Sequence, residues 1–175
     1  MRKLLIIALS VLIFKANAEA NLWVGVALPE FKLADQSGNI KSNSDFMGHW
    51  MVLYFYPKDR TPGCTVEAQN FSDDYKQYQM LDTNIVGVSY DDVASHQDFA
   101  QTYAMQFTLL ADVEHDLSKA LKVDRIFPWP HASRQTFVVN PAGFIVKHYE
   151  DVTPETHSQT LLQDLKKLQQ TDSKK

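Results

Sequence analysis

Glycine is scarce in this 175-residue sequence, and its scarcity excludes a class of function. The chain contains six glycines, and they stand too far apart to build the glycine-rich loop that cradles a phosphate in nucleotide-binding proteins. No Walker-type or dinucleotide-binding motif is present either. Nucleotide chemistry is therefore not expected.

Cysteine is scarcer still, because Cys64 is the only one in the chain. No disulfide can form within the chain, and no zinc site built from paired cysteines is possible. The six histidines show no H-x-x-x-H spacing and have no neighbouring cysteine. We therefore expect neither a metal site nor a bound cofactor.

Positive charge is not in excess, since 21 acidic residues against 17 basic ones give a formal net charge of -4 at pH 7. Three of the basic residues lie in the first 18 positions, which contain no acid, so the chain without that segment would carry -7. An acidic protein lacks the electrostatic footprint of nucleic-acid binding. No nucleic-acid partner is expected.

Long hydrophobic runs are absent apart from one near the N-terminus. The chain opens with a basic start (Met1–Lys3), an apolar stretch (4–14) and an A-x-A cleavage pattern (16–18). This pattern predicts a signal peptide over residues 1–18, cleaved after Ala18 or Ala20, with an uncleaved membrane anchor as the alternative. The apolar stretch is shorter than the ~20 residues that span a bilayer, which favours the signal peptide. We therefore expect a periplasmic or secreted protein that has no membrane contact after cleavage.

Residues 19–175 are expected to form one α/β domain, because β-rich runs alternate with helical ones. The run 51–56 is almost continuously apolar, as a central strand covered on both faces should be. A turn at Pro141–Gly143 predicts an antiparallel hairpin, so the sheet should be mixed. Further strands are predicted at 84–90, 135–140 and 144–149, helices at 65–80, 92–103, 115–121 and 154–170, and a hairpin turn at 35–39.

Cys64 follows residues that predict the start of a helix. Thr61 is a good N-cap and Pro62 suits the first helical position, which places Cys64 in the first turn. The free N–H groups and the positive end of a helix favour an anion, and the thiolate is the nucleophilic form of cysteine. From this position alone, a half-sheltered reactive thiol of lowered pKa and an inert buried cysteine are both open.

The residues around Cys64 resemble the peroxiredoxins. Pro57, Thr61 and Cys64 match the P-x-x-x-T-x-x-C motif of that family, and the string Tyr54–Ala68 is similar to its bacterioferritin comigratory protein, or peroxiredoxin Q, subfamily. The likeness extends over nearly all of the chain after the leader through two further segments, Leu28–Phe31 and Arg134–Asn140. The resemblance implies a thioredoxin-like fold, with a central mixed β-sheet flanked by helices, and a thiol-dependent peroxidase that reduces hydrogen peroxide and organic hydroperoxides.

Carried over to this sequence, the resemblance gives roles to five residues. Cys64 would be the nucleophile that attacks the peroxide oxygen and becomes a sulfenic acid. Thr61 would hydrogen-bond the peroxide or the thiolate, and Pro57 would limit the access of water. Arg134 would supply a positive charge to the thiolate and the departing oxygen, and Glu67 would hold Arg134 in place. From the residues alone, a surface arginine and a carboxylate stabilised by the helix dipole stay open as alternatives for these last two.

The chain departs from the subfamily in lacking a second cysteine. Many members carry a resolving cysteine five positions after the first, where this chain has Gln69. An oxidised Cys64 therefore cannot close an intramolecular disulfide, and turnover must use an external thiol or a thioredoxin-like reductant. For the oligomeric state we expect a monomer or a weak homodimer.

Two other functions stay open from the sequence. Thr61–Cys64 occupies the place of a C-x-x-C motif, which would suit a secreted thioredoxin-like thiol–disulfide oxidoreductase, although the first cysteine is missing. The second alternative is a non-catalytic binding or chaperone module on the same fold.

Trp129, between two prolines shortly before Arg134, is interpreted as part of a surface loop rather than as a pocket wall or an interface patch.

Overall fold

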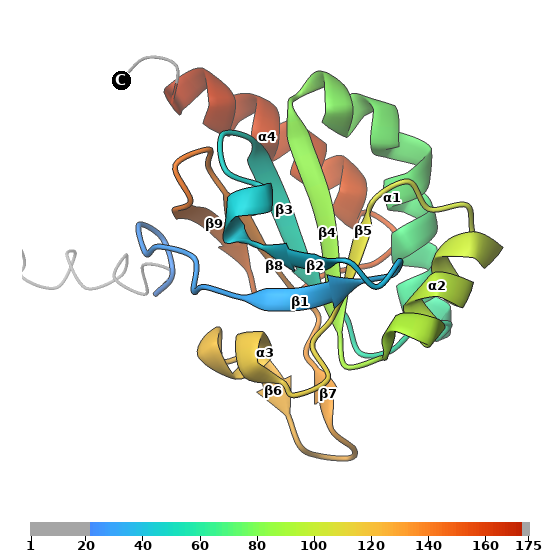
Figure 1. Cartoon of the computed structure of the whole chain (residues 1–175). Coiled ribbons are helices and arrows are strands. Elements are labelled where there is room, and N and C mark those ends of the chain that lie inside the picture. Colours follow the sequence, from blue (N-terminus) through green and yellow to red (C-terminus); the bar gives the residue numbers. More distant parts are fainter. Residues whose placement is uncertain (1–21, 173–175) are drawn as a thin grey trace, which may run out of the picture.

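The computed structural model of the chain describes residues 22–172, and its centre is a seven-stranded sheet with helices on both faces (Figure 1). The strand order is β2-β1-β5-β4-β3-β8-β9. β3, β4 and β5 run parallel, whereas the outer pairs are antiparallel, so the predicted mixed sheet is confirmed. The strands are β1 (Lys32–Asp35), β2 (Ile40–Ser42), β3 (Trp50–Phe55), β4 (Thr83–Ser89), β5 (Thr108–Ala111), β8 (Gln135–Val139) and β9 (Ile145–Tyr149).

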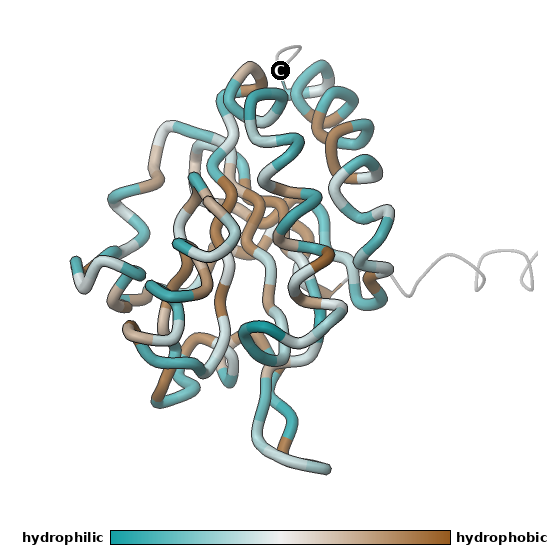
Figure 2. Tube along the Cα trace, turned by 90° about the vertical axis from the view of Figure 1, so that its right-hand side faces the viewer, coloured by the Kyte–Doolittle hydropathy of each residue, from teal (hydrophilic) through white to brown (hydrophobic). Residues whose placement is uncertain are grey.

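β3 is the central strand and is buried along its whole length. Because side chains alternate along a strand, Val52 and Tyr54 face one core and Leu53 and Phe55 face the other. This double burial explains why its sequence is continuously apolar instead of alternating. The hydrophobic strands lie inside the molecule, and the helices turn hydrophilic residues outward (Figure 2).

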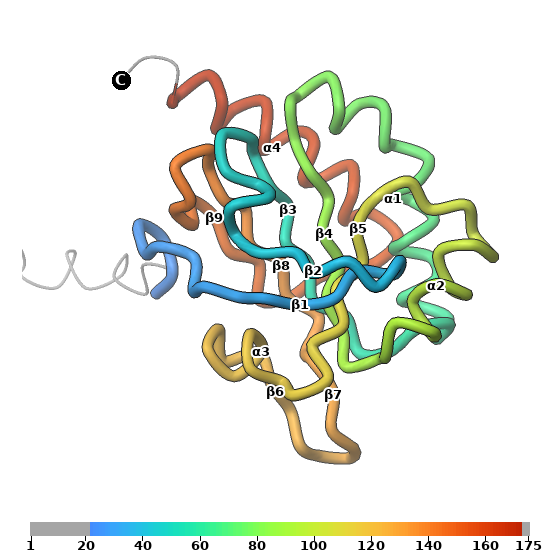
Figure 3. Tube along the Cα trace, in the orientation of Figure 1, coloured from blue at the N-terminus to red at the C-terminus, as the bar shows by residue number. Residues whose placement is uncertain are grey.

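The helices divide between the two cores. α1 (Pro62–Met80), α2 (Val93–Thr102) and α4 (His157–Asp172) bury residues in the first core, which contains Cys64. α3 (Asp116–Ala120) and the N-terminal segment around Leu28 cover the second core. A short 3-10 helix (Asn43–Asp45) precedes β3, and the hairpin of β6 (Asp124–Arg125) and β7 (His131–Ala132) projects from the body (Figure 3).

The predicted elements agree with the structure most closely where the apolar runs are long. β3, β4, β8 and β9 begin and end within one residue of the predicted strands, and the predicted turn at 35–39 joins β1 to β2. α1 begins at Pro62, before the predicted start at 65, whereas α4 begins at His157, after the predicted 154. β5 was not predicted, because four residues are too few to show a period.

The predicted signal peptide, residues 1–18, lies outside the described residues. Among residues 22–172, no helix combines the length and the apolar character needed to cross a membrane.

Gly87 shapes the core beneath α1. It lies in β4 opposite Tyr54 of β3, and a Cβ at this position would lie 2.7 Å from the Tyr54 hydroxyl and 2.8 Å from Leu109 Cδ2. The missing side chain makes room for the Tyr54 ring, which packs 4.7 Å from the ring of Phe71 on α1. The absence of a side chain at Gly87 thus allows α1, the helix that carries Cys64, to pack closely against the sheet.

Candidate active site

Cys64 lies in the first turn of α1, beyond the carboxyl end of β3, where the loop 56–61 joins strand to helix. Thr61 occupies the N-cap position and Pro62 is the first helical residue, as predicted. The prediction of a half-sheltered sulfur is wrong, because Cys64 is only 2% exposed. Ala68 and Phe71, on the same face of α1, are fully buried, and this packing draws the first turn down onto the sheet.

Arg134 connects Cys64 with Glu67. It immediately precedes β8, which pairs with β3, so it lies beside the start of α1. One guanidinium nitrogen, Nη2, donates to Cys64 Sγ at 3.2 Å, and the other, Nη1, donates to Glu67 Oε2 in an ion pair. The side chains of Arg134 and Glu67 are 18% and 1% exposed. Arg134 is therefore not a surface arginine, and one largely sheltered cation contacts both the sulfur and a carboxylate.

The charges at this site oppose the effect of burial. Burial raises the pKa of Glu67 to about 7, and the positive charge of Arg134 limits that rise. Burial alone would lower the pKa of Arg134, but Glu67 and Cys64 outweigh it and raise that pKa. Among the described residues, the second carboxylate oxygen of Glu67, Oε1, is buried without a hydrogen-bond partner. The guanidinium thus stays charged beside the sulfur.

Thr61 and Pro57 lie in the loop that leads to Cys64. The Thr61 hydroxyl donates to the Lys58 carbonyl at 3.1 Å and does not cap the helix with its side chain. Its backbone carbonyl accepts the first helical hydrogen bond, from Thr65 N–H at 2.9 Å. Pro57 is half-buried. The contacts predicted for Thr61 with a peroxide, and for Pro57 with water, stay predictions.

Comparison with known proteins places this arrangement in a family. Residues 24–148 match the model of the AhpC/TSA family. The chain belongs to the AhpC/TSA family. Peroxiredoxin Bcp of Bacillus subtilis is 36% identical over 148 residues, which span 82% of this chain and 94% of that protein. A putative peroxiredoxin bcp of Helicobacter pylori is 35% identical over 149 residues, which span 82% and 98%.

Solved structures agree with this membership. Peroxidoxin BcpB of Mycobacterium tuberculosis has a TM-score of 0.76 at 28% identity and covers 82% of this chain and 96% of its own. The bacterioferritin comigratory protein of Xanthomonas campestris has a TM-score of 0.74 at 31% identity and covers 78% and 90%. This peroxiredoxin therefore has the predicted thioredoxin-like fold. It is a thiol-dependent peroxidase, which sets aside both alternative functions.

Three residues of the site were missed from the sequence. A Cβ on Gly63 would lie 3.3 Å from Arg134 Nη2 and 3.6 Å from Pro154 Cγ, so this glycine lets the guanidinium and Pro154 approach the helix start. The Asn70 amide on α1 donates to the Pro154 carbonyl at 3.1 Å and holds that segment in place. Contacts between residues 84 positions apart leave no periodic signal in the sequence.

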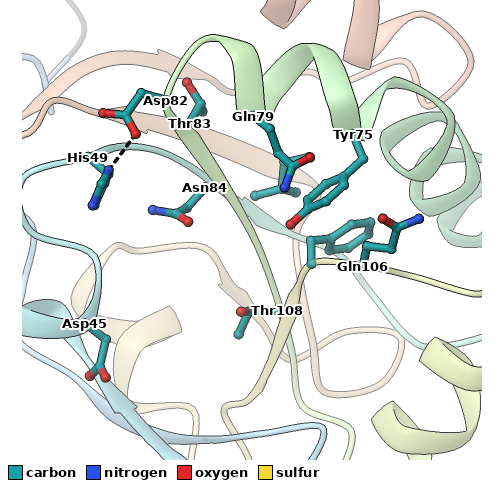
Figure 4. Close-up of a pocket in the computed structure, with 11 residues that line it drawn as sticks. Asp45, His49, Tyr75, Gln79, Asp82, Thr83, Asn84, Gln106 and Thr108 are labelled. Carbon is teal, nitrogen blue, oxygen red and sulfur yellow. Dashed lines mark hydrogen bonds and ion pairs between the residues drawn. The ribbon is translucent and has the colours of Figure 1, made fainter.

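A cavity of about 380 Å³ lies at the other end of the parallel strands of this peroxiredoxin (Figure 4). It is lined by the start of β4 and the end of α1, and Cys64 is not among its lining residues. His49 and Asp82 point toward each other at its edge, with 2.6 Å between Nδ1 and Oδ1. Both side chains are more than half exposed. The cavity is therefore separate from the site around Cys64.

The β6–β7 hairpin carries Trp129, which is partly exposed and packs with its ring centroid 4.4 Å from that of His131. This placement fits the interpretation of Trp129 as part of a surface loop. Within residues 22–172, no three histidine, cysteine, aspartate or glutamate side chains are grouped so that they could hold a metal ion.

Proposed function

We propose that this peroxiredoxin reduces hydrogen peroxide and organic hydroperoxides through a sulfenic acid on Cys64, which an external thiol then reduces. The observation that carries the proposal is the contact of 3.2 Å between the only cysteine and the partly buried guanidinium of Arg134. A positive charge in a site of low dielectric favours a sulfur anion, which is the nucleophilic form of cysteine.

In the first step, the Cys64 thiolate attacks one peroxide oxygen. An S–O bond forms, the O–O bond breaks, and the departing alkoxide or hydroxide carries away the electron pair. Arg134 stabilises the charge that develops on this oxygen, and Glu67 fixes the orientation of the guanidinium. Arginine is not a proton donor at ordinary pH, so the departing oxygen takes its proton from water.

In the second step, the thiol comes from outside the chain. One external thiol attacks the sulfenic sulfur, releases water and forms a mixed disulfide, and a second thiol attacks this disulfide and restores Cys64. Gln69 lies exposed on α1 at the position of the resolving cysteine in many relatives, and no other cysteine exists. A small thiol or a thioredoxin-like protein fits the reductant.

We also propose that residues 1–18 direct the protein to the periplasm or outside the cell. The basic start, the short apolar stretch and the A-x-A pattern support this assignment. N-terminal sequencing of the protein recovered from cell fractions tests it. A periplasmic or secreted protein that begins at Glu19 or Asn21 is expected, and an uncut protein in the cytoplasm would contradict the proposal.

The mechanism is tested by mixing the reduced protein with peroxide and measuring its mass. With one equivalent of hydrogen peroxide, we expect the rapid gain of one oxygen atom on Cys64. With excess peroxide and no thiol, we expect consumption to stop once Cys64 has been oxidised beyond the sulfenic acid to a sulfinic or sulfonic acid, and to continue only when dithiothreitol is added. Cys64→Ser nearly preserves the shape of the side chain. This variant should neither gain an oxygen atom nor consume peroxide, and its circular dichroism should match that of the wild type. Peroxide consumption by this variant, or sustained turnover without thiol, would refute the mechanism.

A further inference from the structure

The loop that leads to Cys64 contains a second buried carboxylate, which the proposed mechanism does not use. Asp59 lies two residues before Thr61, and its side chain is 2% exposed. The carboxylate accepts hydrogen bonds from the Tyr56 hydroxyl at 2.7 Å and from the Ser95 hydroxyl at 2.7 Å. It also lies 2.9 Å from His96 Nδ1. Ser95 and His96 belong to α2, so the carboxylate joins the loop to that helix.

His96 is fully buried and is held from both sides. Its Nε2 lies 3.1 Å from the carbonyl oxygen of Leu110 in β5, and a carbonyl only accepts, so Nε2 carries a proton. Its Nδ1 faces the carboxylate, so Asp59 and His96 share a further proton, either as an ion pair or as a neutral hydrogen-bonded pair. Burial acts to raise the pKa of Asp59, but the contacts with His96, Ser95 and Tyr56 outweigh it and lower that pKa. Loss of either partner would leave a buried polar group unsatisfied, which is destabilising.

The backbone of Asp59 and the side chain of Arg60 make further contacts on the side of the molecule where α2 lies. The Asp59 backbone N–H donates to Asp91 Oδ2 at 2.9 Å, and Arg60 forms an ion pair with Asp98 of α2. Arg60 has a φ of 60°, in the left-handed region, which is unfavourable for a residue with a side chain. A backbone held in this conformation needs contacts on both sides to keep it there.

We propose that the Asp59–His96 pair is a clamp that fixes the loop 56–61, and with it the start of α1, in the conformation that places Cys64 against Arg134. Asp59 and His96 are then positioning residues for the reaction with peroxide, a consequence that rests on the proposed function. Cys64 is only 2% exposed. We infer that movement of this loop opens the sulfur to an external thiol, which is bulkier than hydrogen peroxide. The clamp therefore favours oxidation of Cys64 and opposes its reduction.

The test compares these two half-reactions in Asp59→Ala. The rate of thiol oxidation by hydrogen peroxide in a single turnover should fall roughly 10- to 100-fold, because a misplaced reacting atom is costly. The rate at which dithiothreitol reduces the oxidised enzyme should rise. Asp59→Asn, which keeps the shape of the side chain and can still hydrogen-bond Tyr56 and a neutral imidazole, should lie between this variant and the wild type for both rates.

Asp164→Ala is the matched control. Asp164 on α4 also accepts from a tyrosine hydroxyl, that of Tyr149 at 2.8 Å, and pairs with a cation, Lys147. Its loss should lower the thermal stability without changing the two rates in opposite directions. The proposal is overturned if Asp59→Ala leaves oxidation unchanged, or if both rates fall together as in a protein that is merely destabilised. Should Asp59→Ala not fold, the same outcomes in Asp59→Asn decide the question.

Hydrogen exchange separates the clamp from the peroxidase mechanism. Amides of residues 56–63 should exchange faster in the Asp59 variants than in the wild type, while residues 65–80 of α1 keep their protection. Hydrogen exchange can be measured whether or not the protein is active. If the wild type had no peroxidase activity but the Asp59 variants exchanged faster, the clamp would be supported and the proposed function refuted. Unchanged exchange would refute the clamp whatever the activity.

Discussion

The two ends of the parallel strands differ in how they hold polar groups. At the carboxyl end, Cys64, Glu67 and Arg134 contact one another almost out of reach of water. At the amino end lies a polar cavity of about 380 Å³, where the paired His49 and Asp82 side chains are largely exposed. Charges interact more strongly away from water, which supports the carboxyl end as the reactive end in the proposed mechanism. In that mechanism, the volume of a cavity is a poor guide to the position of the active site.

The largest expected effect comes from removing the cation at the buried end. Arg134→Met keeps the aliphatic part of the side chain and should slow oxidation of Cys64 by on the order of 100- to 1,000-fold. Arg134→Lys should recover only part of the rate, because a point charge cannot contact Sγ and Glu67 together as the planar guanidinium does. Stopped-flow oxidation with excess hydrogen peroxide measures these rates.

Two further variants sharpen this test. Arg125→Met removes an exposed arginine on β6 and should react like the wild type. The double variant Arg134→Met/Glu67→Gln leaves no unpaired buried carboxylate, so it separates lost catalysis from lost stability. An unchanged oxidation rate in Arg134→Met would show that the contact with Cys64 has no catalytic role.

A smaller effect, on stability, is expected from Glu67. Its pKa is about 7 in the folded protein, above the ordinary 4.5, because the carboxylate is buried. A raised pKa means that Glu67 stabilises the fold fully below pH 4.5 and that this contribution is lost as the pH rises through 7. Urea unfolding should therefore show Glu67→Gln gaining stability over the wild type between pH 5 and 8, by on the order of a few kcal/mol.

The matched control is Glu114→Gln, at an exposed carboxylate just before α3, which should show no such gain. A wild type that instead became more stable than Glu67→Gln with rising pH would mean that Arg134 keeps Glu67 ionised throughout.

The smallest effect is expected at the open end of the strands. His49→Ala removes the exposed contact with Asp82 and should change the free energy of unfolding by less than about 1 kcal/mol, since exposed ion pairs contribute little. The oxidation rate of Cys64 should equal that of the wild type. Thermal denaturation and the same stopped-flow assay measure both quantities, and a slower reaction would show that the two ends are coupled.

The sequence predicts best what depends on neighbours along the chain. The strand 51–56 is predictable because double burial demands a nearly continuous apolar run, and the strand 84–90 because most of its residues are apolar. The helix start at Cys64 was recognised because Thr61 and Pro62 are strong local signals. The role of Arg134 is predicted only by the resemblance to peroxiredoxins.

Contacts between distant segments could not be predicted in the same way. The burial of Cys64 depends on how closely α1 packs onto the sheet, which in turn depends on the absent side chain of Gly87. Asp59 and His96 are 37 positions apart, and nothing in their local sequence shows that they meet. Such contacts follow from the packing of α2 against the loop and need the structure.

The register of β8 against β3 decides on which face of the sheet the Arg134 side chain lies. Phe55 pairs with Gln135, and the residues Thr136 and Val138 turn toward the helices of the first core. Arg134 continues this alternation and so reaches Cys64. A slip of one residue turns every side chain of a strand to the opposite face, which would point the guanidinium toward α3. Under the proposed mechanism, insertion or deletion of a single residue within β8 should therefore abolish activity although Cys64, Glu67 and Arg134 are all still present. The number of residues in this strand is then as important as their identity.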